Sequence, residues 1–381
     1  MSNDSFSEVT STGWLSRIGK SITGVLVGLL LTVAAFPVLW WNEGRSVKTY
    51  QGLVEGEKIA ITVPAEAVDP ANDGKLIHLS GRAEAKDQVT DSVFGIGTPG
   101  TIKLRRTVEM FQWVEDKKTT TRTKLGGGEE KVTEYTYHKE WSEKTHDSRE
   151  FRQPQGHTNP QPAYTSETFL SNNATLGAFV LPRPMIEGWR DLRPMATPAA
   201  DIAAEFRDKV LVQNGWIYLA GKADPAELGH LRVKFEAIPA GDASLLARQV
   251  KNTFEPFTTK VGTQISRLSA GVMSKESMFA AAQAENTTLT WILRGGGLFM
   301  MLIGLVMILQ PFKVLADILP LAGKIVGAGT GMVAFLLAGI GSSLTIALAW
   351  LWYRPLLGAT VLAVTVFLIV MLVRSLRKRR A

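Results

Sequence analysis

The sequence has no cysteine among its 381 residues. It therefore has no disulfide bond, no thiolate nucleophile and none of the cysteine-based zinc sites. Any domain of this chain that folds outside the cytoplasm needs a hydrophobic core of its own, because no covalent cross-link stabilises it. The absence leaves the compartment open, since such a chain can fold in oxidising and reducing surroundings alike.

Histidine is scarce as well, with five in the chain. One polar stretch combines three of them with acidic residues: His138, His146, His157, Glu140, Glu143 and Asp147. Their spacing matches no established metal-ligand pattern. We interpret them as histidines of a solvated loop and expect no metal site.

Motifs of catalysis are also missing. Gly126-Gly127-Gly128 lacks the Lys-Ser/Thr ending of a phosphate-binding loop and predicts instead the tip of a hairpin. No serine stands in a nucleophile elbow, and acidic pairs such as Glu115-Asp116 lie among lysines and threonines, as on a solvated surface. We therefore expect no enzymatic activity, no catalytic residue and no cofactor.

Charged side chains are almost absent from four long stretches, which are residues 22–41, 291–309, 325–353 and 356–373. About 20 apolar residues in a helix cross a hydrocarbon core about 30 Å thick. These stretches predict four transmembrane helices, one near the N-terminus and three near the C-terminus. Arg294 lies close enough to the start of the second for its side chain to reach the lipid headgroups.

A cleaved signal peptide is the alternative for the first stretch, because Arg17 and Lys20 precede it as in a basic leader. The stretch is long, however, and ends in Pro37, Trp40 and Trp41 rather than in the small residues of a cleavage site. We expect it to be retained as a helix.

Lysine and arginine mark the sidedness of the chain. They are concentrated in residues 374–381 and also lie at Arg17, Lys20, Lys313 and Lys324. Because such cations favour the cytoplasmic face, residues 1–21 and 374–381 are predicted to be cytoplasmic and residues 42–290 to lie on the other side. The basic tail directly follows an apolar stretch, so we expect it to contact lipid headgroups rather than nucleic acid.

Strand patterns recur between the first two stretches, at residues 58–63, 76–83, 102–113, 134–141, 216–220 and 231–238. In the third of these, Leu104, Arg106, Val108 and Met110 share one face, as the period of two in a strand requires. Residues 242–254 and 274–286 predict helices. The predicted fold class is an α+β membrane protein with a large, mainly antiparallel β-rich domain.

Two segments of this domain are similar in sequence, and we call this similarity the internal echo. Residues 77–84 (IHLSGRAE) align without gaps on residues 217–224 (IYLAGKAD). The echo predicts two similar strand-turn-strand halves. A chance similarity of strand and turn composition is the alternative.

Two groups of residues in or beside the spans are candidates for function. Small residues that permit close helix contact stand four apart at Gly24 and Gly28, and at Gly323, Gly327 and Gly331. We favour packing within one bundle over a dedicated oligomer contact. The second group stands at the end of the first span and is a candidate for coupling the membrane helices to the domain. It consists of Trp41, Asn42, Glu43, Gly44 and Arg45. An ordinary aromatic belt with interfacial polar groups is the alternative.

The chain resembles the transmembrane protein 43 family, also called LUMA, in segments that cover nearly its whole length. The segments are residues 41–45 (WNEGR), 72–78 (NDGKLIH), 104–115 (LRRTVEMFQWVE), 135–141 (YTYHKEW), 156–160 (GHTNP), 231–235 (LRVKF) and 353–356 (YRPL). The family architecture, one span followed by a large domain and three spans, agrees with the apolar stretches found here. The polar insert and the tails diverge from the family.

In animals the resemblance implies a protein of the endoplasmic reticulum and inner nuclear membrane that associates with itself, with emerin and with lamins. Similar proteins occur in bacteria, where those partners are absent, and we expect this chain to be of the bacterial type. Its domain would then face the periplasm from the inner membrane, or the lumen in a eukaryotic host.

These observations lead to two hypotheses about function. The first is a scaffold that organises membrane protein complexes, with membrane lipids, other membrane proteins and copies of itself as partners. The second is a ligand- or lipid-sensing module whose external domain biases the helix bundle.

Overall fold

The computed structural model describes residues 4–197, 201–207, 209–220, 222, 224–355 and 360. The chain forms two compact units. Unit 1 comprises residues 1–8, 54–119 and 133–280, and unit 2 comprises residues 9–53, 120–132 and 281–381. The fourth predicted span, residues 356–373, lies outside the described residues apart from Thr360.

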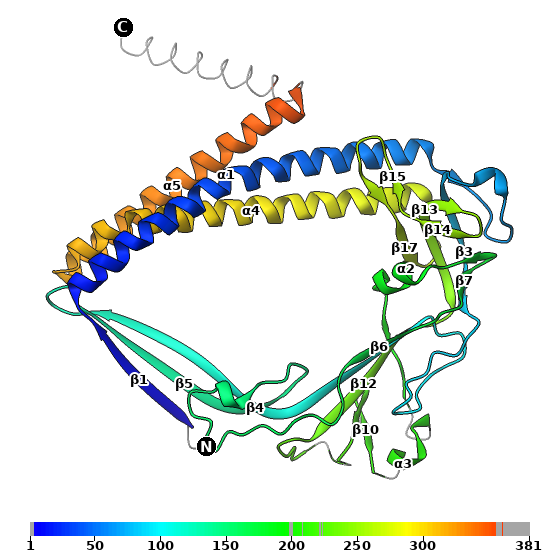
Figure 1. The fold of residues 1–381 in the computed structure, drawn as a ribbon, viewed down its shortest axis with the longest axis horizontal. Coiled ribbons are helices and arrows are strands. Elements are labelled where there is room, and N and C mark those ends of the chain that lie inside the picture. The colour runs from blue at the N-terminus through cyan, green and yellow to red at the C-terminus, as the bar shows by residue number, and fades with distance from the viewer. Residues whose placement is uncertain are drawn as a thin grey trace, which may run out of the picture. The chain divides into compact units, whose positions relative to one another are not determined.

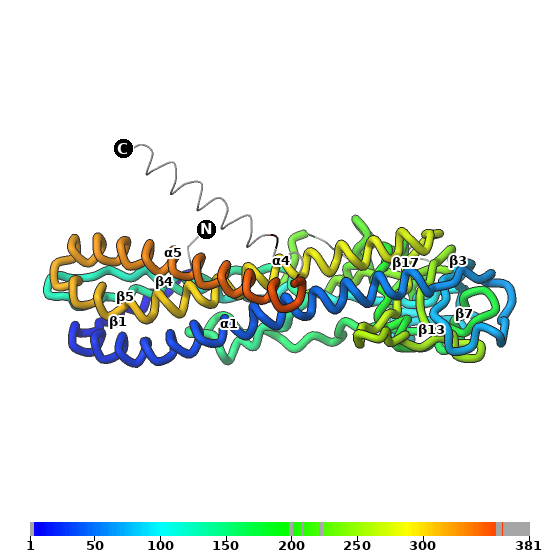
Figure 2. Tube along the Cα trace, turned by 90° about the horizontal axis from the view of Figure 1, so that it is seen from above, coloured from blue at the N-terminus to red at the C-terminus, as the bar shows by residue number. Residues whose placement is uncertain are grey.

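Three long helices carry the apolar stretches of unit 2: α1 (Trp14–Ile59), α4 (Lys275–Ala316) and α5 (Pro320–Tyr353). In the part of the chain that the structure describes, these three are long and apolar enough to cross a membrane (Figures 1 and 2). Lipid offers backbone N–H and C=O groups no partners, so an apolar stretch satisfies them within a helix. The first three predicted spans are therefore helical, and α1 and α4 extend well beyond them.

Close contacts between small residues hold α1 against α4. A Cβ atom on Gly28 would lie 2.5 Å from the carbonyl oxygen of Gly304, and one on Gly304 would lie 2.6 Å from that of Gly28. Gly24 is less crowded, with the methyl group of Met307 3.9 Å from its Cβ position. Gly28 therefore serves packing within the bundle, as the sequence predicts.

The predicted glycine face of α5 divides between two environments. A Cβ atom on Gly323 would collide with the Asp317 carboxylate, and one on Gly327 would lie 3.1 Å from the side chain of Lys313. Gly331 has no such neighbour within 4 Å in the described structure. Gly323 thus makes room for the connection between α4 and α5, Gly327 makes room for the last turn of α4, and Gly331 leaves an open surface.

Gly28→Leu should destabilise the bundle by about 1–3 kcal/mol, because an overpacked contact forces its neighbours apart. The measurement is reversible unfolding of the full-length protein in mixed detergent micelles. Gly19→Leu is the matched control, since a Cβ atom there meets nothing within 4 Å. Equal stability of the two variants would contradict a close α1–α4 contact.

Two β-sheets contain most of the strands. One has the order β1-β5-β4-β12-β11-β10, with β6 also paired to β4 and β9 to β12. Its strands are Ser5–Thr12 (β1), Glu129–Ser142 (β5), Lys103–Thr123 (β4), Leu231–Ile238 (β12), Trp216–Tyr218 (β11), Leu211–Gln213 (β10), Glu167–Leu170 (β6) and Arg193–Pro194 (β9). The tip of the β4–β5 hairpin belongs to unit 2.

The second sheet has the order β14-β13-β3-β7-β8, with β17 paired to β13 and β2 to β3. Its strands are Thr253–Glu255 (β14), Gly241–Val250 (β13), Leu76–Ala85 (β3), Ala174–Leu176 (β7), Phe179–Val180 (β8), Arg267–Ala270 (β17) and Ile61–Thr62 (β2). Phe257–Thr258 (β15) and Gln264–Ile265 (β16) form a separate pair, and short helices occupy Arg183–Gly188 (α2) and Ala204–Arg207 (α3). Strands β2 and β3 pair in parallel, and the other strand pairs whose register the structure describes are antiparallel.

The alternation predicted for β4 is present in the structure. Leu104, Arg106, Val108 and Met110 are buried, and β12 pairs with β4 in a register that places Val233 opposite Val108. These strands cover a core with Phe94, Ile217 and Phe235. The four residues predicted to share one face of this strand are thus buried together.

The helix predicted at residues 242–254 is wrong, because Gly241–Val250 is strand β13. This strand pairs with β3 over eight residue pairs and with β17 on its other side. Leu245 and Leu246, on opposite faces of the strand, are both fully buried. Burial on both faces removes the alternation from which a strand is recognised in sequence.

The internal echo does not correspond to one repeated local structure. Ile77 to Glu84 lies within the ten-residue strand β3. In the other copy, strand β11 ends at Tyr218, and Leu219 and Ala220 form a turn. The similarity in sequence is therefore one of composition over these residues, contrary to the expectation of two equivalent strand-turn-strand segments.

Candidate functional site

A buried ion pair lies where the apolar part of α1 ends. Glu43 is 2% exposed, and its two carboxylate oxygens accept hydrogen bonds from Nε and Nη2 of Arg294 in α4, at 2.7 and 2.8 Å. The indole nitrogen of Trp350 in α5 donates to the same carboxylate at 2.8 Å. One side chain of α1 thus contacts both other described long helices.

Aromatic rings complete the surroundings of Arg294. Its guanidinium carbon lies 4.7 Å from the ring centre of Trp291 and 5.6 Å from that of Trp350. Bidentate pairing and stacking on aromatic rings both suit the planar guanidinium group better than an ammonium group. Arg294 therefore pairs within the bundle, whereas the sequence predicted a side chain that extends toward the lipid headgroups.

Further hydrogen bonds join α1 to α4 about one helical turn from the Glu43–Arg294 pair. The side-chain nitrogen of Asn42 donates to the Thr290 carbonyl at 3.1 Å, and Arg45 donates to Asn286 and to the Thr290 hydroxyl, each at 3.0 Å. Asn286 in turn donates to the carbonyl of Ser46. We call these residues, together with Glu43, Arg294 and Trp350, the Glu43 node.

The structure brings together four of the five candidate coupling residues. Asn42, Glu43 and Arg45 belong to the node, and Gly44 packs so closely on Tyr353 of α5 that a Cβ atom would lie 2.6 Å from its ring. Trp41 is 58% exposed, as expected of a residue in an aromatic belt. The node fixes the register of three helices, while a role in coupling them to the domain stays a prediction.

Breaking the Glu43–Arg294 pair should cost about 3–5 kcal/mol, because Glu43→Gln leaves Arg294, whose side chain is 15% exposed, without its counter-charge. The double variant Glu43→Leu with Arg294→Leu should recover most of this loss. Unfolding in mixed micelles measures both. Glu187→Gln is the control, since its exposed pair with Arg183 contributes less than about 1 kcal/mol.

A second polar cluster lies at the other end of the bundle. Arg17 is 7% exposed and contacts Asp317 at 2.5 Å, Glu129 at 3.1 Å and the Gly127 carbonyl at 2.6 Å. The indole of Trp14 donates to the Val314 carbonyl at 2.8 Å. We call these residues the Arg17 cluster.

This cluster was not predicted from the sequence, although the sequence contains one signal for it. Asp317 is the single acidic residue among residues 286–381. An isolated carboxylate beside apolar stretches points to a nearby cation. The sequence could not identify that cation, because Arg17 lies 300 residues away.

The Arg17 cluster bears on the predicted sidedness. Within unit 2 the tip of the β4–β5 hairpin contacts the N-terminal end of α1 and the α4–α5 connection, where the Gly126 amide donates to the Ile318 carbonyl. The charge pattern instead places the tip and this helix end on opposite membrane faces. A polar hairpin with exposed backbone cannot cross hydrocarbon, so the tip contact and the topology predicted from charge exclude each other. The sidedness therefore stays a prediction.

The cysteine-free sequence allows a direct test with single cysteines. Leu125→Cys at the tip and Ser16→Cys beside Arg17 should react with an impermeant thiol reagent from the same membrane face, because the hairpin tip contacts this helix end. Gln51→Cys reports on the far end of α1. Labelling of Leu125→Cys and Ser16→Cys from opposite faces would reject the contact in membranes and support the topology predicted from charge.

The histidines of the polar stretch have separate surroundings in unit 1. His157 is buried, contrary to the expectation of a solvated loop: its two ring nitrogens contact the Gln153 carbonyl and Asp4, each at 2.8 Å. It stacks on Tyr137, whose burial and hydrogen bond to Glu115 raise its pKa to about 12. Among the described residues, no three His, Asp or Glu side chains form a group that could hold a metal ion.

The long apolar helices and antiparallel sheets define the chain as an integral, multi-pass α+β membrane protein. A family model described as Transmembrane protein 43 matches residues 110–355, and the chain belongs to this family.

Relatives of that name agree over nearly the whole chain. The mouse protein is 30% identical over 92% of this chain and 89% of its own length, and the human protein is 30% identical over 90% and 88%. A homolog from Drosophila melanogaster is 27% identical over 88% of this chain and 90% of its own. No solved structure matches the chain.

Proposed function

We propose that this protein is a membrane-anchored scaffold that organises membrane protein complexes through its helices and its β-rich domain. Membership of the transmembrane protein 43 family supports the anchoring in a membrane. The observation that carries the proposal is the outer surface of α5, which combines exposed apolar side chains with an open glycine.

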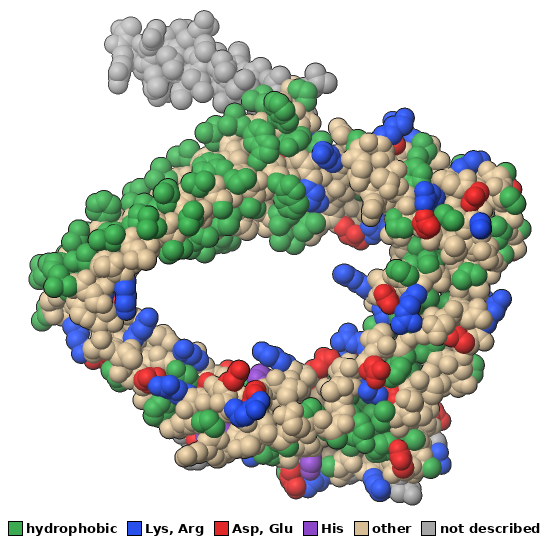
Figure 3. Space-filling model, viewed as in Figure 1, with side chains coloured by type: hydrophobic (Ala, Val, Ile, Leu, Met, Phe, Trp, Pro, Cys, Tyr) green, Lys and Arg blue, Asp and Glu red, His purple; other side chains and the backbone are tan. Residues whose placement is uncertain are grey.

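The two faces of α5 differ in their surroundings. Ala334, Ala338, Ser342, Thr345 and Ala349 recur every three or four residues and are buried. Exposed apolar residues occupy the remaining surface: Ile325, Met332, Val333, Phe335, Leu336, Leu337, Ile340, Leu344, Leu348 and Trp352. Apolar side chains cover much of the visible surface of the long helices (Figure 3).

Gly331 gives this surface a feature beyond lipid contact. A Cβ atom there would meet nothing within 4 Å in the described structure, and the same holds for Gly339. Small residues on an exposed membrane helix let a second helix approach closely, and close packing is a main source of helix association in lipid. A helix of another membrane protein, or of a second copy, suits this surface.

Crosslinking in native membranes followed by mass spectrometry tests the scaffold. We expect covalent complexes with other membrane proteins or with a second copy, and Gly331→Leu should reduce their yield several-fold by preventing close approach. Ile325→Leu keeps the exposed volume and is the matched control. Recovery of the monomer alone, while a known complex crosslinks efficiently in the same membranes, would reject the proposal.

We also propose a setting for the domain, which rests on the charge pattern and on the resemblance given above. The β-rich domain would face the periplasm from the inner membrane of a bacterial host, or the lumen of the endoplasmic reticulum in a eukaryotic one. A lipid-sensing module is the second candidate function. A pocket lined by Lys20 and Lys131 beside the Arg17 cluster favours this second function.

A further inference from the structure

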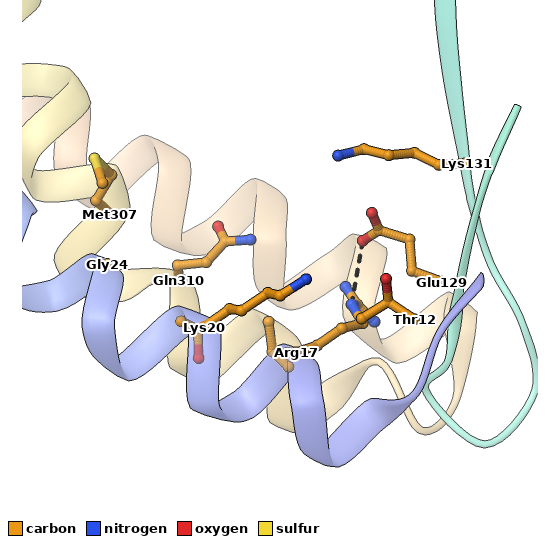
Figure 4. A pocket seen from close by; sticks show the side chains of 10 residues that line it. Thr12, Arg17, Lys20, Gly24, Glu129, Lys131, Met307 and Gln310 are labelled. Carbon is orange, nitrogen blue, oxygen red and sulfur yellow. Dashed lines mark ion pairs between the residues drawn. The ribbon is translucent and has the colours of Figure 1, made fainter. Parts of the chain in front are cut away.

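A pocket of about 290 Å³ lies within unit 2, beside the Arg17 cluster. Its lining comes from the start of α1, the last turns of α4 and the two strands β1 and β5 near the hairpin tip (Figure 4). Ligand pockets start at about 300 Å³. The volume therefore suits a small polar group rather than an entire lipid.

Cationic side chains outnumber acidic ones in the lining. Arg17, Lys20 and Lys131 contribute three cations, and Glu129 is the one carboxylate among the residues that line the pocket. Figure 4 shows Lys20 and Lys131 extending from opposite sides into the space between helix and hairpin. The pocket therefore favours an anion.

The two lysines are available, whereas Arg17 is not. The donors of Arg17 are occupied by Asp317, Glu129 and the Gly127 carbonyl, and Glu129 is thereby partly neutralised. Within the described part of the chain, neither Lys20 nor Lys131 takes part in a hydrogen bond or an ion pair. Lys20 and Lys131 supply six N–H donors that await an acceptor.

The remaining lining distinguishes a membrane site from a site for a soluble anion. Gly24, Met307 and Val314 provide an apolar side, and Gln310 adds an amide donor. Lys20 is the last charged residue before the uncharged residues 22–41, and Gln310 directly follows the apolar residues 291–309. The pocket thus lies at the boundary where lipid headgroups meet hydrocarbon.

We infer that this pocket binds the phosphate of an anionic phospholipid. Lys20 and Lys131 pair with the phosphate oxygens, and the Gln310 amide donates a further hydrogen bond. The acyl chains leave along Gly24 and Met307 into the bilayer. The inference goes beyond the scaffold proposal and does not depend on it, because it rests on the pocket and not on the outer surface of α5.

Native mass spectrometry of the full-length protein in detergent tests this site with two probes, dioleoylphosphatidylglycerol and dioleoylphosphatidylcholine. The wild type should retain the anionic lipid preferentially. Each lysine should contribute about fivefold to the affinity for the anionic lipid. Lys131→Gln should therefore weaken binding of this lipid about fivefold, and the double variant with Lys20→Gln about 30-fold. Binding of phosphatidylcholine should stay unchanged.

Two controls and one fallback variant make the result decisive. Lys86→Gln with Lys118→Gln removes the same charge from exposed positions outside the pocket and should leave binding unchanged. Lys20→Arg with Lys131→Arg should retain most of the binding. Should the double glutamine variant fail to fold, Lys131→Gln alone, at an exposed position, carries the test.

A soluble anion is the other source of a phosphate group. Glycerol phosphate and inorganic phosphate are added in a separate arm as competitors of the anionic lipid. We expect neither to displace it at equal concentration, since they lack acyl chains. Displacement at equal concentration, or equal loss of binding in the Lys86/Lys118 control, would overturn the inference.

Discussion

The ion pair between Glu43 and Arg294 is the interaction on which the arrangement of the bundle depends. Apolar side chains pack in many registers with similar free energy, because lipid tails are as apolar as leucine. A buried charge without a partner is costly in such surroundings, so a register that separates Glu43 from Arg294 is strongly disfavoured. The Trp350 hydrogen bond extends the same constraint to α5. The Arg17–Asp317 pair adds an equivalent constraint at the opposite end of the helices.

Patterns local in sequence predicted much of this molecule. The apolar stretches identified three described helices, and the predicted bounds of β12 agree with the structure at Leu231 and Ile238. Strand β4 was predicted from the period of two that puts Leu104, Val108 and Met110 on one face, and all three side chains are buried. The same period put Arg106 on the face of these residues, and the structure shows it buried there, where it pairs with Asp91 at 2.6 Å.

Interactions between residues far apart in the sequence could not be predicted from local patterns. The sequence predicts a helix where strand β13 lies, because the burial of this strand on both faces depends on its partners β3 and β17, and no local pattern shows them. The candidate residues Asn42, Glu43 and Arg45 were recognised from their place after an apolar stretch. Their partners Thr290, Asn286 and Arg294 lie more than 240 residues away, so only the fold shows them to be a network. The family model, which begins at residue 110, covers Arg294 and Trp350 but not Glu43.

The two charged pairs also set a length. Arg17 and Glu43 are separated by 26 positions in a continuous helix, which corresponds to about 39 Å along its axis. Sliding one helix past another would break both pairs at once, so the axial distance between the two pairs is fixed. A bilayer that does not match this length must tilt the bundle or change its own thickness, at a cost of fractions of a kcal/mol per Å. A membrane whose hydrocarbon thickness matches this length needs neither adjustment.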